Sequence, residues 1–586
     1  MIPARAALAA FVAFIATAPL FLAEFHVTLM NYIGLGTMTA LGLVLLTGVA
    51  GVMSFGQQVF VGIAAYTSAV LTTKYGASPW ISLFVSLFLV AAVSLFLGAI
   101  TLRLSGHYLP ISTLAWGIAI YFLFGNMELL GKYTGIPDIP PISIGSLKLN
   151  NGVKIYYLVW AVALALLIAS ANLLDSRAGR AIRALRFRAV MAESFGVDTA
   201  RLKSVVFLCA ALFAALSGWL YAHFLRFVSP NAFNVNAGIE YLFMAVIGGA
   251  SHVWGAVIGA SVLTLLKEWL KDLLPTRFGA SGNYEAVVFG ALMLLLLHRA
   301  STGLGPLLAR WFIKPQRRDI SLHAEPLPRR EFPKEEFILK VQEAKKRFGG
   351  IIAVRELTFE MRSGEILGLI GPNGAGKSTM FNLITGVLPC DGGQIDCRGR
   401  RIDGLAPSAI ARLGIARTFQ HVNLVGQMSV LENAAIGAHL RGRRGVLAAM
   451  LRIDRAEERR LLAEAARQIE RVGLGAHLHD AAGSLPLGKQ RLVEIARALS
   501  ADPALLLLDE PAAGLRYAEK QALADLLRRL RGESMSILLV EHDMDFVMRL
   551  VDRLVVLDFG EKLAEGLPQA IQADPKVMEA YLGSVA

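Results

Sequence analysis

Charged residues are scarce in this sequence. Asp, Glu, Lys and Arg make up 18% of its 586 residues, whereas about a quarter is usual for soluble domains. This shortage argues against a purely soluble enzyme. Cysteine is scarcer still, because Cys209, Cys390 and Cys397 are too few and too scattered for a disulfide framework or a zinc site. Nothing in the sequence therefore points to an oxidising compartment.

The charges that are present fall mainly in the second half of the chain. Residues 1–314 hold 20 Lys and Arg and 10 Asp and Glu, whereas residues 315–586 hold 38 and 35. The first part carries apolar stretches close to the roughly 20 residues that cross a bilayer, and the second has the composition of one large soluble domain. Residues 315–335 combine four prolines with charged residues, which predicts an extended linker. We therefore expect a membrane domain at 1–314, a linker at 315–335 and a soluble domain at 336–586.

Apolar stretches near bilayer length recur through the membrane domain. They lie near residues 7–23, 29–50, 56–73, 80–103, 108–125, 155–173, 204–227, 237–274 and 284–298. The first resembles a secretory signal but lacks a convincing small-residue cleavage site, so we expect an uncleaved span. The longest should split near Gly248 and Gly249 into two spans. The prediction is a helical membrane domain of about eight to ten helices.

The orientation of this domain follows from a basic loop at residues 174–203. The loop holds seven Lys and Arg against three Asp and Glu, and the positive-inside rule makes it cytoplasmic. From Arg177 to Gly196, apolar and basic residues alternate at helical spacing, and the glycine offers a stop. This helix could bind anionic lipid or dock on another cytoplasmic domain, and the loop alone does not decide between the two.

A few polar residues lie within apolar stretches, where they are costly and therefore candidates for function. Ser54, Gln57 and Gln58 would suit a broken helix that lines a substrate path, although close packing between helices explains them equally well. Glu240, at the expected start of a span, is interpreted as a partner of the helix dipole. His223 is interpreted as an interfacial residue without chemistry.

The soluble domain contains a specific phosphate-binding motif. The apolar strand E-I-L-G-L-I precedes G-P-N-G-A-G-K-S-T, which matches the P-loop pattern between Gly371 and Ser378. Its glycines let backbone N–H groups turn towards phosphates, while Lys377 binds the phosphates and the Ser378 hydroxyl reaches Mg²⁺. We predict a nucleotide site formed by Gly371, Pro372, Asn373, Gly374, Ala375, Gly376, Lys377, Ser378 and Thr379.

Further residues complete the predicted catalytic site. A second apolar strand, A-L-L-L-L-D-E-P, ends in Asp509, which is expected to hold the Mg²⁺ shell, and in Glu510, which is placed to polarise the attacking water. His542, after another β-rich run, is expected to reach the γ-phosphate, and Gln420, in A-R-T-F-Q, to sense Mg²⁺ and water. The predicted metal residues are thus Ser378, Gln420 and Asp509, and the predicted catalytic residues are Glu510, His542 and Gln420.

These motifs, in this order and spacing, resemble the P-loop α/β ATPase domain of ABC transporters over residues 336–586. The resemblance implies that Phe348 stacks on adenine and that S-L-P-L-G-K-Q takes the place of the family signature L-S-G-G-Q. Three positions depart from that signature: Pro486, Leu487 and Lys489. Gly488 and the helix N-terminus can still favour an anion. In the family the signature completes the site of a second ATPase domain, so a partner ATPase is expected.

Both halves resemble components of one transport system. D-R-L-V-V-L-D-F-G-E-K-L-A-E-G-L-P is similar to the ATPase subunits of branched-chain amino-acid importers. G-V-A-G-V-M-S-F-G-Q-Q-V-F, S-R-A-G-R-A-I-R-A-L-R and I-E-Y-L-F-M-A-V-I-G-G-A resemble the permease subunits of the same importers, over most of residues 30–300. The chain therefore resembles a fusion of one permease with one ATPase. The resemblance also implies that the helix from Arg177 to Gly196 docks near Gln420.

The resemblance implies ATP-driven import of branched-chain or related amino acids across the cytoplasmic (inner) membrane, with ATP and Mg²⁺ as cofactors. Expected partners are a second permease and ATPase pair, an extracytoplasmic solute-binding protein and the lipid bilayer. The same machinery could instead carry urea, short amides or aromatic and aliphatic carboxylates. A membrane-anchored regulatory ATPase is a third reading, which the many spans disfavour. The net charge of +13 lies mostly in the membrane half, so no nucleic-acid partner is expected.

Overall fold

The computed structural model contains two compact units. It describes residues 4–104, 106–278, 324–330 and 335–582, with isolated positions between 290 and 307. The first unit comprises Met1–Asp175 and Ala200–Arg317, and the second comprises Ser176–Thr199 and Arg318–Ala586. The segment Ser176–Thr199 therefore belongs to the second unit, although in sequence it interrupts the first.

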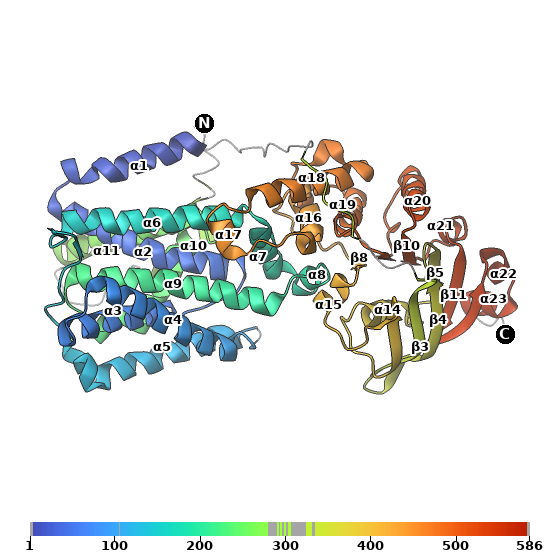
Figure 1. Cartoon of the computed structure of the whole chain (residues 1–586), viewed down its shortest axis with the longest axis horizontal. Coiled ribbons are helices and arrows are strands. Elements are labelled where there is room, and N and C mark those ends of the chain that lie inside the picture. The colour runs from blue at the N-terminus through green and yellow to red at the C-terminus, as the bar shows by residue number, and fades with distance from the viewer. Residues whose placement is uncertain are drawn as a thin grey trace. The chain divides into compact units, whose positions relative to one another are not determined.

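The first unit is a helical bundle (Figure 1). Its helices are α1 Ala4–Phe21, α2 Glu24–Leu43, α3 Gln57–Lys74, α4 Pro79–Thr101, α5 Tyr108–Asn126, α6 Gly152–Leu174, α9 Thr199–Leu225, α10 Val235–Gly248 and α11 Val253–Phe278. The π-helical turn η1 Val44–Val49 continues α2. Short elements join the helices: η2 Glu128–Leu130, η3 Lys132–Thr134, η4 Pro230–Phe233 and the hairpin strands β1 Ser143–Ile144 and β2 Leu147–Lys148.

Side-chain caps define where several of these helices begin. The Ser78 hydroxyl accepts a hydrogen bond from the Trp80 N–H at the start of α4, where Pro79 occupies the first helical position. Asn151 and Asn234 cap α6 and α10 in the same way. Each cap satisfies an N–H group that the helix itself leaves open. Proline suits the first position because its fixed φ is already helical.

The helices differ in how far protein surrounds them. In the described residues, six helices are long and apolar enough to cross a membrane, and two shorter apolar helices accompany them. Within the 18-residue apolar stretch of each span, 89% of the residues are buried in the span formed by α2 and η1, whereas 28% are buried in α4 and in α5. Phe84 and Phe88 on α4 are exposed, as expected for a lipid-facing surface. The predicted helical membrane domain is confirmed, but the stretch 284–298 lies largely outside the described residues, so the number of spans stays a prediction.

The predicted division of the longest apolar stretch is confirmed. Helix α10 ends at Gly248 and α11 begins at Val253. A Cβ atom on Gly248 would lie 1.7 Å from the Gly255 carbonyl oxygen, and one on Gly259 would lie 1.6 Å from that of Met244. The two helices therefore pack backbone against backbone, which only glycine permits at these positions.

Two polar residues of the bundle differ from the sequence-based interpretation. Glu240 does not lie at a helix start, because α10 begins at Val235, and its carboxylate instead accepts a 2.7 Å hydrogen bond from the Lys267 ammonium of α11. His223 is buried rather than interfacial. Its Nδ1 lies 2.7 Å from the Pro140 carbonyl oxygen and its Nε2 lies 2.9 Å from the Ser68 hydroxyl, so both ring nitrogens have structural partners.

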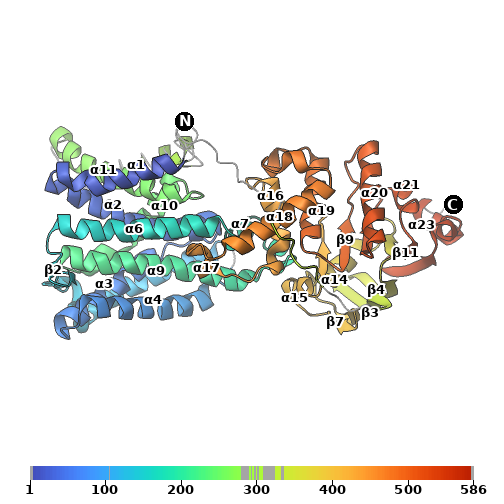
Figure 2. The ribbon, with the colours of Figure 1, turned by 45° about the horizontal axis from the view of Figure 1, so that its top comes forward.

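The second unit contains an α/β domain with two sheets (Figure 2). Its strands are β3 Phe337–Phe348, β4 Ile351–Arg362, β5 Ile366–Ile370, β6 Gly392–Cys397, β7 Arg400–Arg401, β8 Ile415–Arg417, β9 Leu505–Asp509, β10 Ser536–Val540, β11 Arg553–Asp558 and β12 Glu561–Gly566. Its longer helices are α14 Lys377–Ile384, α16 Val430–Gly437, α18 Arg455–Arg471, α19 Leu487–Ser500, α20 Tyr517–Gly532 and α23 Pro575–Leu582. Shorter helices are α7 Arg177–Phe187, α8 Ala189–Glu193, α15 Pro407–Arg412, η5 Ala438–Arg441, α17 Val446–Met450, η6 Gly475–His477, η7 Ala482–Ser484, α21 Met544–Met548 and α22 Pro568–Gln572.

The larger sheet forms the core of this unit. Its strand order is β12-β11-β5-β10-β9-β8, and β10 runs parallel to both β5 and β9. Every residue of these three strands is buried, as expected for parallel strands covered on both faces. This explains the continuous apolar runs from which two of the strands were predicted. The carboxyl ends of parallel strands meet at one edge, where α/β proteins place their ligands.

A buried amide fixes the chain between β8 and α16. The Asn433 side chain accepts a 2.8 Å hydrogen bond from the Val425 N–H and donates to the carbonyl oxygens of Val425 and Ser429 at 3.1 and 3.0 Å. Ser429 and Glu432 form a capping box at the start of α16. The Asn433 side chain and the capping box therefore hold the backbone of the loop that follows Gln420 against the start of α16.

We expect Asn433→Ala to destabilise the ATPase unit by about 2 kcal/mol, because it leaves buried backbone groups without partners. For a unit of this size the midpoint of thermal unfolding should fall by roughly 4–8 °C. Differential scanning calorimetry of the full chain in detergent measures this shift. The exposed Gln572 on α22 provides a matched control, and an equal shift in Asn433→Ala and Gln572→Ala would show that the buried amide has no special role.

Candidate functional site

The P-loop joins the end of β5 to the start of α14. Gly371, Gly374 and Gly376 adopt positive φ angles of 149°, 87° and 98°, which L side chains rarely adopt. The ammonium of Lys377 donates to the carbonyl oxygens of Gly371 and Pro372 at 2.7 and 2.8 Å. The loop therefore curls around a positive charge and precedes a helix N-terminus, an arrangement that favours phosphate binding.

The electrostatics of Lys377 are those of a partly desolvated cation. Burial lowers the pKa of this ammonium, and the carboxylates of Glu510 and Asp509 oppose that shift. A phosphate group would supply the negative charge that burial has made favourable. Ser378 is exposed at the start of α14 and Thr379 is half-buried, so the Ser378 hydroxyl is accessible to a ligand.

The structure brings together the three predicted catalytic residues. Glu510 Oε1 lies 2.9 Å from His542 Nε2 and 3.1 Å from Gln420 Nε2. Glu510 follows β9, His542 follows β10 and Gln420 follows β8, so neighbouring strand ends deliver all three side chains. Glu510 has a positive φ of 49°, a conformation uncommon for a residue with a side chain. A carboxylate held in this way is suited to accept a proton from water.

Asp509 precedes this cluster and is almost fully buried. Its N–H donates to the Thr418 hydroxyl at 3.2 Å, and its Oδ2 lies 3.9 Å from the Arg417 guanidinium. Burial raises the pKa of Asp509 to about 6, and Arg417 opposes this shift. Among the described residues, no side chain or backbone group bonds to the buried Oδ1 atom.

This free carboxylate oxygen fits a Mg²⁺ ion or a water bound to it. Mg²⁺ usually binds proteins through one or two carboxylates, with substrate phosphates and water completing the shell. No group of three His, Cys, Asp or Glu residues could hold a metal in the part of the chain that the structure describes. The residues present therefore suit a metal that arrives with a nucleotide.

Sequence reasoning missed two residues that position the cluster. Arg491 on α19 donates to the carbonyl oxygens of Glu510 and Gln420 at 2.7 and 3.2 Å. Glu541 accepts hydrogen bonds from the N–H groups of Ala512 and His542 at 2.6 and 3.0 Å. Glu541 could have been predicted, because it is adjacent to His542 in the sequence. Arg491 could not, because no sequence pattern relates it to Glu510 or Gln420.

Two predicted nucleotide-binding residues lie outside the Glu510 cluster. Phe348 ends β3, and its ring is 45% exposed, so it can receive a ligand. Gly488 lies in the first turn of α19, and a Cβ atom on it would lie 2.8 Å from Leu515. Lys489, next to it, lies 2.8 Å from His477 Nε2. The structure thus places Gly488 beside Leu515, and its anion-binding role stays a prediction.

The basic segment at residues 174–203 forms two helices instead of the single one predicted. Arg188 has an extended backbone, with φ −154° and ψ 96°, and separates α7 from α8. Ser176 caps α7 by accepting a hydrogen bond from the Gly179 N–H at 3.2 Å. Helix α8 ends at Glu193, three residues before Gly196, which has a positive φ of 83° and at which the sequence predicted the stop.

This segment docks on the helices of the second unit. Arg180 pairs with Glu458 of α18, and both side chains are buried. Arg183 pairs with Glu432 of α16 at 3.1 Å, and Arg177 donates to the His439 carbonyl oxygen at 2.7 Å. The contacts favour the docking interpretation over binding to lipid.

A chain of contacts leads from the docked segment to the loop after Gln420. The Arg497 guanidinium lies 5.0 Å from the centre of the Phe195 ring. It also donates to the Asn423 carbonyl oxygen at 2.8 Å and pairs with Glu494 at 2.9 Å. The docking position is therefore near Gln420, as predicted.

The family models match both halves of the chain. Residues 25–297 match the branched-chain amino acid transport system permease component, residues 354–513 the ABC transporter model, and residues 561–586 the branched-chain amino acid ATP-binding cassette transporter. The permease match covers the bundle from α2 to α11 but not α1, and the other two cover the P-loop, the Glu510 strand, β12, α22 and α23. The two halves thus match different components of one system.

Individual relatives match the ATPase half. The high-affinity branched-chain amino acid transport ATP-binding protein LivG of Salmonella typhimurium and of Escherichia coli strain K12 is 43% identical over 249 residues, 42% of this chain and 98% of the relative. BraF of Pseudomonas aeruginosa, which has the same description, is 41% identical over the same shares. A crystal structure of a nucleotide-free ATP-binding cassette is 31% identical, covers 42% of this chain and 100% of its own, and has a TM-score of 0.38.

The family models and the LivG and BraF relatives agree with the geometry of the site. The second unit is an ATP-binding ABC ATPase whose hydrolysis is coupled to transport, and the apolar helices place the chain in the inner membrane with the ATPase on the cytoplasmic side. The chain therefore belongs to the branched-chain amino-acid ABC transporter family, and it joins a permease component and an ATP-binding component in one polypeptide.

Proposed function

We propose that this chain supplies one permease and one ATPase to an importer of branched-chain or related amino acids. One observation carries the proposal: the Glu510, His542 and Gln420 cluster occurs in a single chain with a permease of the branched-chain class. The names of the LivG and BraF relatives support the cargo.

The proposed assembly needs further components. A chain with one ATPase requires a second permease and ATPase pair, because in the proposed family arrangement the signature segment at Gly488 completes the nucleotide site of a second ATPase. An extracytoplasmic solute-binding protein would deliver the cargo. We propose that the functional domains are residues 1–314 and 336–586, joined by residues 315–335.

The proposed hydrolysis assigns a role to each residue of the site. The P-loop N–H groups and Lys377 bind the nucleotide phosphates, and Phe348 stacks on adenine. Ser378, Gln420 and Asp509 would hold Mg²⁺, which would supply positive charge to neutralise the phosphates. Glu510 accepts a proton from the attacking water. His542 bonds to the Glu510 carboxylate at 2.9 Å and holds it towards the water.

The docked segment gives a route from hydrolysis to the permease. Movement of the loop after Gln420 would shift Asn423, then Arg497 and then the Phe195 ring, because each contacts the next. Phe195 lies between α8 and α9 in sequence. A displacement of this segment is thereby passed directly to a helix of the permease, as alternating access requires.

Membrane vesicles that carry the chain with its partner subunits and binding protein test the proposed function. We expect ATP-dependent uptake of radiolabelled leucine, isoleucine or valine. Glu510→Gln should retain ATP binding but lower hydrolysis and uptake at least about 100-fold, because an amide cannot accept the proton.

Glu561→Gln is the matched control, since this carboxylate is exposed on β12 and pairs with Arg355. Hydrolysis at the normal rate in Glu510→Gln would contradict the assigned role. Uptake of urea or carboxylates with no uptake of amino acids would contradict the cargo while leaving the ATPase assignment intact.

Removing the buried guanidinium at Arg180 tests the docking route. Arg180→Ala leaves Glu458 buried without its partner, which costs about 3–5 kcal/mol. We expect the amount of solute imported per ATP hydrolysed to fall at least roughly ten-fold, while hydrolysis continues. Parallel uptake and phosphate-release assays on the same vesicles give this ratio.

The exposed Arg186 on the same helix supplies the control, because Arg186→Ala removes an arginine from α7 without opening the buried pair. A normal ratio in Arg180→Ala would show that the docking of α7 is not needed for coupling.

A further inference from the structure

A short segment of the predicted linker lies across the ATPase. Within residues 324–330, the carbonyl oxygens of Pro326 and Pro328 accept hydrogen bonds from Arg460 and Arg441 at 3.3 and 3.0 Å. The N–H of Arg330 donates to Asp502 at 2.6 Å. These bonds hold the segment against α18, η5 and the loop before β9.

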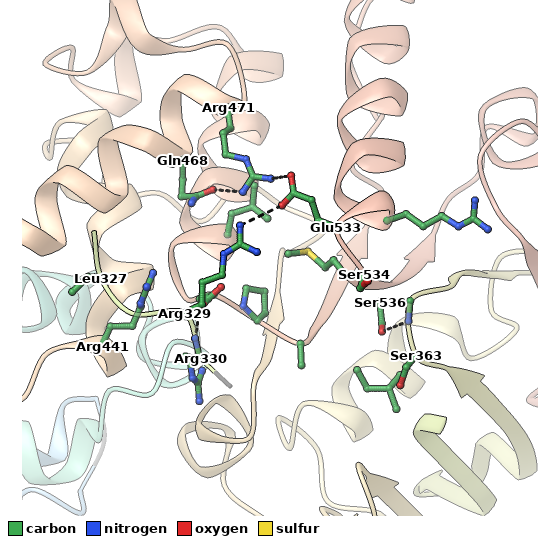
Figure 3. Close-up of a pocket in the computed structure, with 18 of the residues that line it drawn as sticks. Leu327, Arg329, Arg330, Ser363, Arg441, Gln468, Arg471, Glu533, Ser534 and Ser536 are labelled. Atoms are coloured by element: carbon green, nitrogen blue, oxygen red, sulfur yellow. Dashed lines mark hydrogen bonds and ion pairs between the residues drawn. The ribbon is translucent and has the colours of Figure 1, made fainter. Parts of the chain in front are cut away.

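The segment borders a cavity of about 1010 Å³ (Figure 3). The other walls come from η5, from α18, from the end of α20 and from the loop between α19 and β9. Residues of β3 and of the turns after β4 and β6 complete them. Seven arginines line it: Arg329, Arg330, Arg398, Arg441, Arg467, Arg471 and Arg531. Four carboxylates accompany them: Glu335, Glu464, Asp502 and Glu533. The lining is therefore positively charged overall.

Two of these carboxylates are each shared by two arginines. Glu533 lies 2.8 Å from Arg471 and 3.9 Å from Arg329, and Figure 3 shows it between them. Glu464 lies 2.9 Å from Arg467 and 3.2 Å from Arg441. Each shared carboxylate leaves one positive charge that its own negative charge cannot balance.

The crowding of positive charge has an electrostatic cost. Burial lowers the pKa of the Arg330 guanidinium, and Arg441 and Arg398 lower it further, while Asp502 opposes them. Exposed ion pairs contribute little to stability, and the Arg329 side chain is 81% exposed. Fixing the linker segment therefore does not by itself explain seven arginines around one cavity.

We propose that this cavity binds a soluble ligand with two or more phosphoryl groups. Guanidinium groups are planar forks that bond phosphate oxygens in pairs. The cavity is at the upper end of the range for small-molecule sites, so it can hold a ligand as large as a nucleotide. No P-loop residue lines it, so this site is distinct from the ATP site.

The proposed ligand contacts several parts of the ATPase at once. Arg467 and Arg471 belong to α18, Arg531 to α20 and Arg329 to the linker segment. Arg531 already pairs with Asp552 at 2.6 Å. A polyanion would compete with Glu464 and Glu533 for the guanidinium groups of Arg467, Arg471 and Arg329 and balance their excess charge. The site therefore joins α18, α20 and the linker segment through a single bound anion.

Calorimetric titration of the full chain with pyrophosphate tests this proposal. The titration uses Lys377→Ala protein in detergent, at low salt and without Mg²⁺, so that the P-loop lysine does not contribute. We expect one saturable site per chain. Removing two cavity charges with Arg467→Gln and Arg471→Gln together should weaken pyrophosphate binding at least ten-fold.

Arg459→Gln is the matched control, because Arg459 is exposed on α18 and does not line the cavity; its binding should be unchanged. ATP binding by the cavity double variant with Lys377 intact verifies that it folds. Should the double variant fail to fold, Arg329→Gln on the exposed linker segment replaces it, with an expected loss of about three-fold. Absence of saturable binding, or equal affinity in the cavity and control variants, would overturn the proposal.

Discussion

The proposed coupling in this transporter depends on the contacts of the buried Arg497 guanidinium. Burying a charge is costly unless its partners are complete, and Arg497 is fully buried. It pairs with Glu494, bonds to the Asn423 carbonyl oxygen and packs on the Phe195 ring. One side chain thus joins α19, the helix at the signature segment, to the loop after Gln420 and to the docked basic segment, so these three parts of the second unit are constrained to move together.

The hydrolytic cluster lies at the other end of the same network. Arg491, also on the signature helix, bonds to the backbones of Glu510 and Gln420. Arg491 and Arg497 therefore connect a single helix to the catalytic carboxylate and to the docked segment. The docked segment is also joined covalently at its two ends to the permease helices α6 and α9. This covalent link adds to the contacts of Arg491 and Arg497.

The sequence predicted those features that local pattern controls. Buried parallel strands are continuous apolar runs in the sequence, so the strands before Gly371 and Glu510 could be predicted. Because these strands belong to one parallel sheet, their ends bring Glu510, His542 and Gln420 together. The break at Arg188 was missed because no glycine or proline marks it. The pair between Glu240 and Lys267 and the bonds of Arg491 depend on tertiary packing between distant segments, which spacing along one segment does not reveal.

A double-mutant cycle shows whether Phe195 and Arg497 act as one coupling unit. The measurement is the amount of solute imported per ATP hydrolysed for Phe195→Leu, Arg497→Met and the double variant in the same vesicles. Each single change should lower this ratio, and the double change should lower it no further than Arg497→Met alone. Losses that multiply independently would show that the two residues do not share one route of coupling.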